Sequence, residues 1–372
     1  MAPGGVRRFP QARKVLAALR PYVPGRSAEE VLELYHPPRV VKLGSNENPL
    51  GLSPRVRTAL IAALDQIHNY PDGGCTRLRQ QLASRLGITP AHLFCANGVD
   101  NVLTCLGLAF LDPGDRCAVG VPSYTAYASL ATLLGAAVVE VPLRDWRFDV
   151  SAMAAAGAKV MFVCNPNNPT GTILRHDEVD TLLARTPPDT LVVVDEAYAE
   201  FADDPAFPDA MALLRRHPNL MILRTFSKIY GLAGLRVGYA IAAPELTASL
   251  DLVREPFPVD RLAQAAAEAV LDDEEYTRAS FENNRAGKTF LAAALTRLGL
   301  RHLPTQANFV LVDLARPSAP VAQRLLERGV IIRPGEIWRL PTWARITIGT
   351  PEDNARLIEA LSAVLEESPA SR

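Results

Sequence analysis

The chain of 372 residues is 48% hydrophobic and 21% charged, with a formal net charge of −1 at pH 7. This length predicts a large domain plus a smaller one, and the composition is that of a globular protein. No basic block indicates a nucleic-acid or membrane-surface partner, and no run of about 18 apolar residues predicts a membrane span.

The cysteines and the N-terminus bear on the compartment. Five cysteines are scattered without a C-x-x-C pair, which indicates free thiols in a reducing environment rather than a disulfide scaffold or a zinc site. The histidines are equally dispersed, so no metal is expected. The basic residues near the N-terminus are not followed by an apolar run, unlike those of a signal peptide. We therefore expect a cytoplasmic protein with small-molecule partners.

The chain is predicted to begin with an arm and a helix. Residues 1–25 are rich in Pro, Gly and Arg, which favours an irregular entry. Ser27 is predicted to cap a helix over residues 27–35, because Glu29 and Glu30 would lie in its first turn, where the helix dipole favours acids. Residues 1–35 are assigned to this arm and helix.

Residues 36–255 alternate short β-rich segments with longer helical ones. Several of the predicted strands are apolar on both faces, as in parallel strands that helices cover on each side. The alternation indicates an open α/β sheet in a large domain. The predicted strands are 93–95, 116–120, 137–141, 160–164, 191–194, 221–223 and 237–241, and the helices between them include 100–110, 124–134 and 178–185.

Residues 256–372 are predicted to form a smaller α+β domain. A Pro-rich stretch at 255–258 precedes a long Ala-rich helical region, 263–298, that resembles a bridge into this domain. Beyond it, apolar runs at 309–312, 330–332 and 345–348 are separated by a helix at 320–328 and followed by a helix from residue 351.

Polar residues follow three of the predicted strands, at the edge where open α/β sheets bind ligands. The strand at 160–164 stops in a Pro, Asn and Gly cluster that contains Asn168. The strand at 191–194 is followed by Asp195 and then by Tyr198. The segment 223–238 places Lys228 among small hydroxyl residues, with Arg236 eight residues later. Each segment alone has a structural explanation as a turn or a helix cap, but all three in this order indicate a functional site.

Together these segments resemble the class I and II aminotransferases of fold-type I, over nearly the whole chain. The resemblance implies a pyridoxal 5'-phosphate (PLP) enzyme, whose larger domain has a mainly parallel sheet covered by helices. Lys228 is then the residue that binds PLP as a Schiff base and later moves a proton, which requires a lowered pKa. Asp195 is implied as the partner of the pyridine nitrogen, and Tyr198 and Asn168 as donors to the phenolic oxygen of the ring.

The same resemblance implies a binding site for the PLP phosphate. The segment 97–101 opens a predicted helix, whose free amides and dipole favour an anion. The family usually has an acid where Asn101 stands, which bears on the local hydrogen bonding. Tyr124 is implied to stack on the pyridine ring. Tyr70 is implied to reach the phosphate of a neighbouring subunit, so the resemblance implies a homodimer with a shared active site. The implied phosphate-binding residues are Tyr70, Gly98, Val99, Asp100, Thr225, Ser227 and Arg236.

Within the family the chain most resembles the histidinol-phosphate aminotransferases, through segments 19–26, 43–51 and 331–334. Arg345 matches the arginine that binds a substrate carboxylate, because a planar guanidinium suits a bidentate contact. A surface ion pair at a strand end is the structural alternative. Histidinol phosphate has no carboxylate, so its phosphate must take the place of the glutamate carboxylate. The residues implied for either anion are Tyr22, Asn168, Arg333, Arg345 and the partner subunit's Tyr70.

The implied reaction converts L-histidinol phosphate and 2-oxoglutarate to imidazole acetol phosphate and L-glutamate, in histidine biosynthesis. An aromatic amino-acid aminotransferase shares most of these segments. The loop 335–341 departs from the histidinol-phosphate group, so Trp338 either lines a pocket for an aromatic ring or covers the smaller domain. Tyr22 has the alternative of packing on the core. A PLP-dependent decarboxylase of a phosphorylated amino acid is a further alternative, and a non-catalytic PLP-binding regulator is disfavoured by the missing DNA-binding segment.

Overall fold

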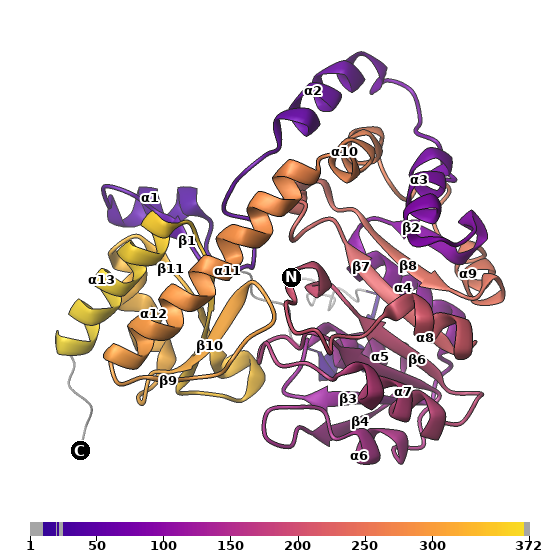
Figure 1. Ribbon diagram of the computed structural model, residues 1–372. Coiled ribbons are helices and arrows are strands. Elements are labelled where there is room, and N and C mark those ends of the chain that lie inside the picture. The colour runs from indigo at the N-terminus through magenta and orange to yellow at the C-terminus, as the bar shows by residue number, and fades with distance from the viewer. Residues whose placement is uncertain (1–9, 20, 22–24, 368–372) are drawn as a thin grey trace, which may run out of the picture.

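The computed structural model describes residues 10–19, 21 and 25–367, and Tyr22 lies outside them. The larger part of the molecule is built on a seven-stranded sheet (Figure 1). Only β8 runs antiparallel to its neighbours, so the sheet is mainly parallel, as predicted. Its strands, in spatial order, are β2 (Leu93–Ala96), β8 (Gly238–Ala242), β7 (Leu220–Thr225), β6 (Leu191–Asp195), β5 (Val160–Cys164), β3 (Arg116–Val121) and β4 (Ala137–Pro142).

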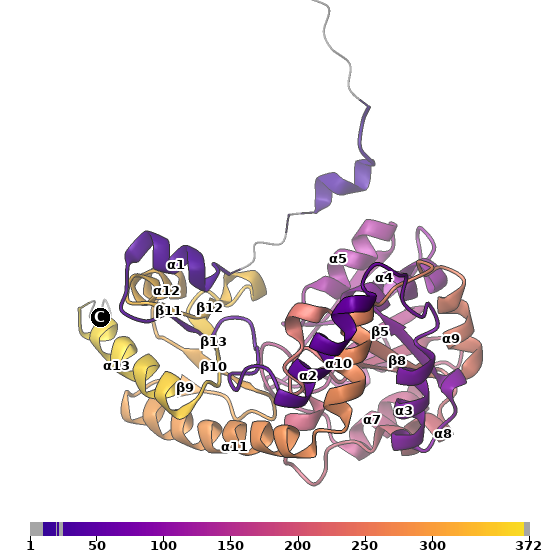
Figure 2. The same ribbon diagram turned by 90° about the horizontal axis from the view of Figure 1, so that it is seen from above.

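Helices lie on both sides of this sheet (Figure 2). Every residue of β5 and β6 is buried, which explains why these strands are apolar without alternation. The helices predicted at 100–110, 124–134 and 178–185 are confirmed within two residues at their ends. The helices of the larger part are α2 (Pro54–Ala63), α3 (Thr76–Leu86), α4 (Gly98–Phe110), α5 (Ala126–Leu134), α6 (Val150–Ala154), α7 (His176–Arg185), α8 (Ala210–Arg216), α9 (Pro244–Asp251) and α10 (Arg261–Leu271).

The smaller part packs helices against short strands. Its antiparallel sheet has the order β12 (Arg333–Pro334), β13 (Trp343–Thr347), β10 (Phe309–Asp313) and β9 (Arg301–His302). A separate parallel pair joins β1 (Val41–Lys42) to β11 (Val330–Ile331). The helices are α1 (Ala28–Tyr35), α12 (Ser318–Glu327) and α13 (Pro351–Glu367). Ser27 caps α1 through a reciprocal pair of hydrogen bonds with Glu30, which confirms the predicted helix start.

The Ala-rich region after residue 260 forms two helices rather than a single rod. Asp273 caps the second helix, α11 (Glu274–Arg297), because its side chain accepts from the amide of Tyr276. Helix α11 runs from the larger part to the smaller one (Figure 1). Its N-terminal Tyr276 packs in the larger hydrophobic core, whereas Leu291 and Leu295 pack in the smaller core.

The two cores divide the chain differently from the sequence-based boundary at residues 255 and 256. Helix α10 belongs to the larger core through Ala263 and Ala266. Conversely, Val41 and Leu43 belong to the smaller core. After α1 the chain therefore crosses between the cores twice, once in the loop that follows Leu43 and once along α11. This loop carries part of the site described below.

All five cysteines are buried free thiols, as the scattered pattern indicated. Within the described ranges, no helix is both long and apolar enough to cross a membrane. Short 3-10 helices complete the fold at η1 (Lys14–Ala18), η2 (Leu64–Gln66), η3 (Pro90–His92), η4 (Ala199–Phe201), η5 (Ala233–Leu235) and η6 (Gly335–Trp338).

Candidate active site

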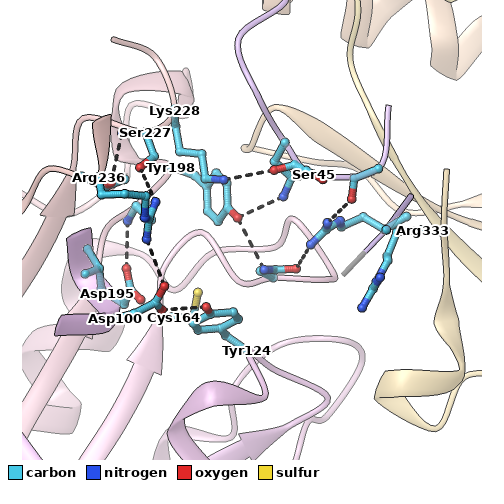
Figure 3. A pocket seen from close by; sticks show the side chains of 18 residues that line it. Ser45, Asp100, Tyr124, Cys164, Asp195, Tyr198, Ser227, Lys228, Arg236 and Arg333 are labelled. Atoms are coloured by element: carbon cyan, nitrogen blue, oxygen red, sulfur yellow. Dashed lines mark hydrogen bonds and ion pairs between the residues drawn. The ribbon is translucent and has the colours of Figure 1, made fainter. Parts of the chain in front are cut away.

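A pocket lies between the two cores, at the carboxyl ends of the parallel strands (Figure 3). The larger part contributes the first turn of α4, the ends of β5, β6 and β7, and the segment after β7. The smaller part contributes β12 and β13, and the loop after β1 closes the pocket between them. Of the residues implied by the resemblance, those that line this pocket are Val99, Asp100, Tyr124, Asn168, Asp195, Tyr198, Thr225, Ser227, Lys228, Arg236, Arg333 and Arg345.

Lys228 projects its amine into the pocket. Nζ donates to the backbone carbonyl of Ser45 at 3.2 Å and lies 5.6 Å from the centroid of the Tyr198 ring. Burial, and then the positive charges of Arg345 and Arg236, lower the pKa of Lys228 to about 8. An amine with this pKa is neutral in a sizeable fraction of molecules near neutral pH, so it can act as a nucleophile or a base.

Asp195 supplies a carboxylate to the same pocket as the Lys228 amine. The carboxylate is only 3% exposed, and it accepts hydrogen bonds from Tyr127 Oη at 2.6 Å and from the amide of Ala197 at 3.0 Å. Burial raises the pKa of Asp195 to about 6, although these two hydrogen bonds oppose the rise. Among the described residues no cation forms an ion pair with Asp195, so the carboxylate is suited to a positively charged ligand group.

Hydrogen bonds link the side chains between the amine and the smaller domain. Arg345 Nη1 donates to Asn168 Oδ1 at 2.6 Å, and Arg345 Nη2 donates to the carbonyl of Gly44 at 2.8 Å. Asn168 Nδ2 in turn donates to Tyr198 Oη at 3.4 Å. A second donor, Asn46 Nδ2, approaches Tyr198 Oη at 3.0 Å. The tyrosine hydroxyl is therefore held on two sides by amide groups (Figure 3).

The other end of the pocket is built for an anion. Gly98 begins α4 with a φ of +76°, and a Cβ at this position would lie 2.6 Å from Arg236 Nη2. A glycine is therefore required where the guanidinium meets the start of the helix. Arg236 Nη1 donates to Ser227 Oγ at 3.3 Å, and the Ser227 amide donates to Thr225 Oγ1 at 3.0 Å. A helix N-terminus, an arginine and two hydroxyls together suit a phosphate.

Asp100 and Tyr124 complete this end. Tyr124 Oη donates to Asp100 Oδ1 at 2.9 Å, and Arg236 Nη2 contacts Asp100 Oδ2 at 3.1 Å. The Tyr124 ring also lies edge-on to that of Tyr127, with centroids 5.4 Å apart. Asn101 accepts a hydrogen bond from the amide of Asn97 at 3.3 Å, so it serves the backbone of the helix start.

Two arginines lie at the smaller-domain side of the pocket. Arg333 and Arg345 are register partners on the antiparallel strands β12 and β13, and both are buried. The guanidinium carbon of Arg345 lies 5.4 Å from the ring centroid of Phe309 and 5.2 Å from that of Trp338. Trp338 is buried and is not among the described residues that line the pocket. Its position favours a role behind Arg345 over direct contact with a substrate ring.

Tyr70 does not enter this pocket. It is 78% exposed, and its ring stacks on Phe257 at a centroid distance of 4.4 Å. The contact implied for Tyr70 is with the phosphate of a second subunit, and its exposed position in one subunit is compatible with that contact. Tyr22, the remaining residue implied for the substrate, lies outside the described residues.

Sequence reasoning missed several residues at the site, among them Tyr127 and Asn46. Tyr127 holds Asp195, and a signal for it was present, because Tyr127 follows Tyr124 by three residues and would share a face of the helix predicted at 124–134. Asn46 stands in the segment 43–51, which carried the resemblance, but its contact with Tyr198 joins positions 152 residues apart. No local pattern predicts such a contact.

The pocket offers complementary groups for each part of PLP. An amine of lowered pKa, a buried carboxylate, a tyrosine hydroxyl and a phosphate-binding end surround a single space. The residues present therefore fit this cofactor, with each charge facing a group of opposite or complementary character.

Comparisons with known proteins find relatives over nearly the whole chain. The model of the family described as "Aminotransferase class I and II" matches residues 38–361. The histidinol-phosphate aminotransferase of Symbiobacterium thermophilum is 48% identical over 358 residues, which cover 95% of this chain and 99% of the relative. Histidinol-phosphate aminotransferase 2 of Carboxydothermus hydrogenoformans is 44% identical over 360 residues, with 95% and 99% coverage.

A solved structure has the same fold over nearly the whole chain. The histidinol-phosphate aminotransferase from Sinorhizobium meliloti, in complex with pyridoxal-5'-phosphate, superimposes with a TM-score of 0.90. The two sequences are 28% identical, and the match covers 97% of this chain and 99% of the solved one.

Proposed function

Because the chain belongs to the class I and II aminotransferases, we propose that it transfers the amino group of L-histidinol phosphate to 2-oxoglutarate with PLP as cofactor. The products are imidazole acetol phosphate and L-glutamate, and the place of the reaction is histidine biosynthesis. The free, buried cysteines favour a cytoplasmic location.

The observation that carries the choice of substrate is the pair of buried arginines, Arg333 and Arg345, on neighbouring strands. A carboxylate needs one guanidinium, whereas a phosphate dianion carries more charge and more acceptor oxygens. Two guanidinium groups on one side of the pocket support a substrate that presents a phosphate in one half-reaction and a carboxylate in the other.

We assign the cofactor contacts from the geometry of the pocket. The first turn of α4, Ser227 and Arg236 would hold the phosphate, and Thr225 supports this group through the Ser227 amide. Asp195 would hold a proton on the ring nitrogen, while Tyr198 and Asn168 would face the phenolic oxygen. Tyr124 would lie against the ring. When bound, PLP supplies a ring that accepts the electrons released as the substrate α-carbon loses its proton.

The protein's own groups then carry the proton. Lys228 would hold the cofactor and, as a free amine, would carry the proton that the substrate α-carbon loses. Its lowered pKa leaves the neutral amine available for this step. Arg345, already held by Asn168 and Gly44, orients the substrate anion with little rearrangement.

We also propose a homodimer in which each active site is completed by the partner. The exposed Tyr70 and the adjacent Phe257 support this arrangement, because an exposed aromatic pair is suited to burial in an interface.

The experiment is a comparison of amino donors with 2-oxoglutarate as acceptor. We expect kcat/KM to be higher for L-histidinol phosphate than for L-phenylalanine. A preference for phenylalanine of more than about 10-fold, which exceeds the discrimination expected from ring contacts alone, would contradict the proposal. Release of carbon dioxide from a phosphorylated amino acid, without formation of a keto product, would identify a decarboxylase instead.

A further inference from the structure

We propose that Asn46 is a positioning residue that makes the Tyr198 hydroxyl donate its proton into the pocket, and that it ties this donor to the smaller domain. The inference rests on the proposed function, because it deepens the role of Tyr198 at the phenolic oxygen of the cofactor. Figure 3 shows the Tyr198 hydroxyl with the hydrogen bonds that it forms to the neighbouring side chains.

The argument starts from the number of hydrogen bonds that a hydroxyl can form. Tyr198 Oη accepts from Asn46 Nδ2 at 3.0 Å and from Asn168 Nδ2 at 3.4 Å. A tyrosine hydroxyl has one proton to donate and two lone pairs that accept. With two N–H groups occupying the acceptor directions, the O–H must point in the remaining one. Because Tyr198 lines the pocket, that direction is available to a ligand oxygen.

The partners of both asparagines favour amide orientations that direct each NH₂ group at Tyr198. Asn168 Oδ1 faces Arg345 Nη1, and a guanidinium can only donate, so the NH₂ of Asn168 must face Tyr198. Asn46 Oδ1 accepts from Thr347 Oγ1 at 3.1 Å. Thr347 Oγ1 also accepts from the backbone amide of Asn46 at 2.9 Å, and its own proton finds an acceptor in Asn46 Oδ1 in this orientation. Both NH₂ groups are therefore directed at the tyrosine oxygen.

The smaller domain holds Asn46 in place. The residue is 1% exposed and has a φ of +57°, a left-handed conformation in which asparagine is enriched. Its carbonyl accepts from Asn308 Nδ2 at 3.0 Å, just before β10, and Thr347 is the last residue of β13. Strands β10 and β13 thus position Asn46, which in turn positions a donor that belongs to the larger domain. The Tyr198 hydroxyl therefore receives a hydrogen bond from a residue that the smaller domain positions.

The test is Asn46→Asp in the full-length holoenzyme. Aspartate tolerates the left-handed backbone, so the loop keeps its shape. An ionised carboxylate can only accept, so it draws the Tyr198 proton away from the pocket. A donor at the phenolic oxygen stabilises negative charge there and disfavours protonation of the adjacent Lys228 linkage. We therefore expect the pH midpoint of the holoenzyme absorbance change to rise, and kcat/KM to fall about 10-fold or more.

Tyr198→Phe provides the matched background. If Asn46 acts through the hydroxyl, Asn46→Asp should shift the pH midpoint clearly less once that hydroxyl is absent, because only the direct effect of the added charge remains. A shift of equal size in both backgrounds would show that Asn46 acts elsewhere, and would overturn the proposal.

Asn46→Gly is the second variant, because it preserves the left-handed backbone and removes the amide side chain, with both its donor to Tyr198 and its acceptor for Thr347, without adding a charge. It should shift the midpoint in the same direction by a smaller amount, since it leaves one lone pair open to water. If Asn46→Asp fails to fold, this variant decides the question, and an unchanged midpoint would overturn the proposal. The midpoint is measured without an amino donor. A wild-type preference for phenylalanine would therefore contradict the proposed substrate and leave the role of Asn46 unaffected.

Discussion

At the scale of single residues, the chemistry depends on how the protein sets the charge of Lys228. Burial and two nearby arginines lower its pKa to about 8 from an ordinary value of 10.5. The unfolded chain therefore binds more protons at this group between those two values, so the lysine adds stability as the pH rises through that window. At neutral pH the same shift favours reactivity at the expense of stability.

This pKa predicts the pH dependence of cofactor capture. The neutral amine attacks the aldehyde of PLP, so the rate at which the apoenzyme binds PLP covalently should rise about tenfold per pH unit below 8 and level off above about 9. Stopped-flow absorbance with apoenzyme and PLP measures this rate. Free Nα-acetyl-lysine is the control, and its rate should continue to rise beyond pH 9. An apoenzyme profile that matched the free amine would contradict the lowered pKa.

The sequence predicted residues that lie next to recognisable strand ends, and missed those defined by tertiary contacts. Lys228, Asp195 and Arg236 stand in segments whose composition already indicated a site, and the structure places all three in one pocket. Tyr127 and Asn46 act through hydrogen bonds to residues distant in sequence, at 68 and 152 positions. The alternatives for Trp338 could be compared only when the structure showed its ring behind Arg345.

At the scale of elements, the start of α4 determines the phosphate-binding end. The helix directs the amides of its first turn toward the pocket, and Gly98 allows Arg236 to approach this turn closely. The sequence predicted this helix start correctly, because a short strand and a glycine precede an apolar helical pattern. It could not predict how closely the guanidinium packs against the glycine.

Gly98→Ala should weaken PLP binding, and Gly87→Ala is the matched control. Both glycines have positive φ, +76° and +64°, but only a Cβ at position 98 would meet Arg236, at 2.6 Å, whereas nothing lies within 4 Å at position 87. Both variants should lose about 1–2 kcal/mol of unfolding free energy from the left-handed backbone. Only Gly98→Ala should raise the PLP dissociation constant, by about 10-fold or more. Thermal unfolding and fluorescence titration measure the two quantities, and equal PLP affinity in both variants would contradict the assignment.

The helical region after residue 260 shows what composition leaves undecided. Alanine favours helix throughout 263–298, but Asp272 and Asp273 end one helix and begin the next. The Asp273 side chain caps α11, an effect that depends on its geometry and not on helix propensity alone. The helical content was therefore predictable, whereas the change of direction was not.

At the scale of the whole molecule, the α/β class and the mainly parallel sheet followed from the alternation of strands and helices, and both are confirmed. The assignment of segments to the two cores did not follow, because it depends on contacts across the chain. Val41 joins the smaller core by pairing with Val330, which lies 289 positions later in the sequence, and α10 packs on α2. The smaller core is formed from two separated segments of the chain, one around Val41 and one after residue 290, so a single boundary in the sequence cannot define it.

Complementation between inactive chains tests the proposed shared site. Lys228→Ala removes the reactive amine, and Tyr70→Glu places a negative charge where the partner's phosphate is expected to bind. A dimer with one chain of each kind contains one site with neither defect, so coexpression should restore activity in roughly a quarter of the sites. Each variant expressed alone should be nearly inactive, and analytical ultracentrifugation should show dimers. Coexpressed protein no more active than Tyr70→Glu alone would contradict a shared site.

Helix α11 constrains how the two cores can shift relative to each other. An uninterrupted helix is stiff, because bending it sharply distorts its backbone hydrogen bonds. The other crossing is the loop after Leu43, whose Gly44, Ser45 and Asn46 hydrogen-bond to Arg345, Lys228 and Tyr198. A connection between the two cores therefore also lines the pocket, so a change in the position of the smaller core would move groups that contact Lys228, Tyr198 and Arg345.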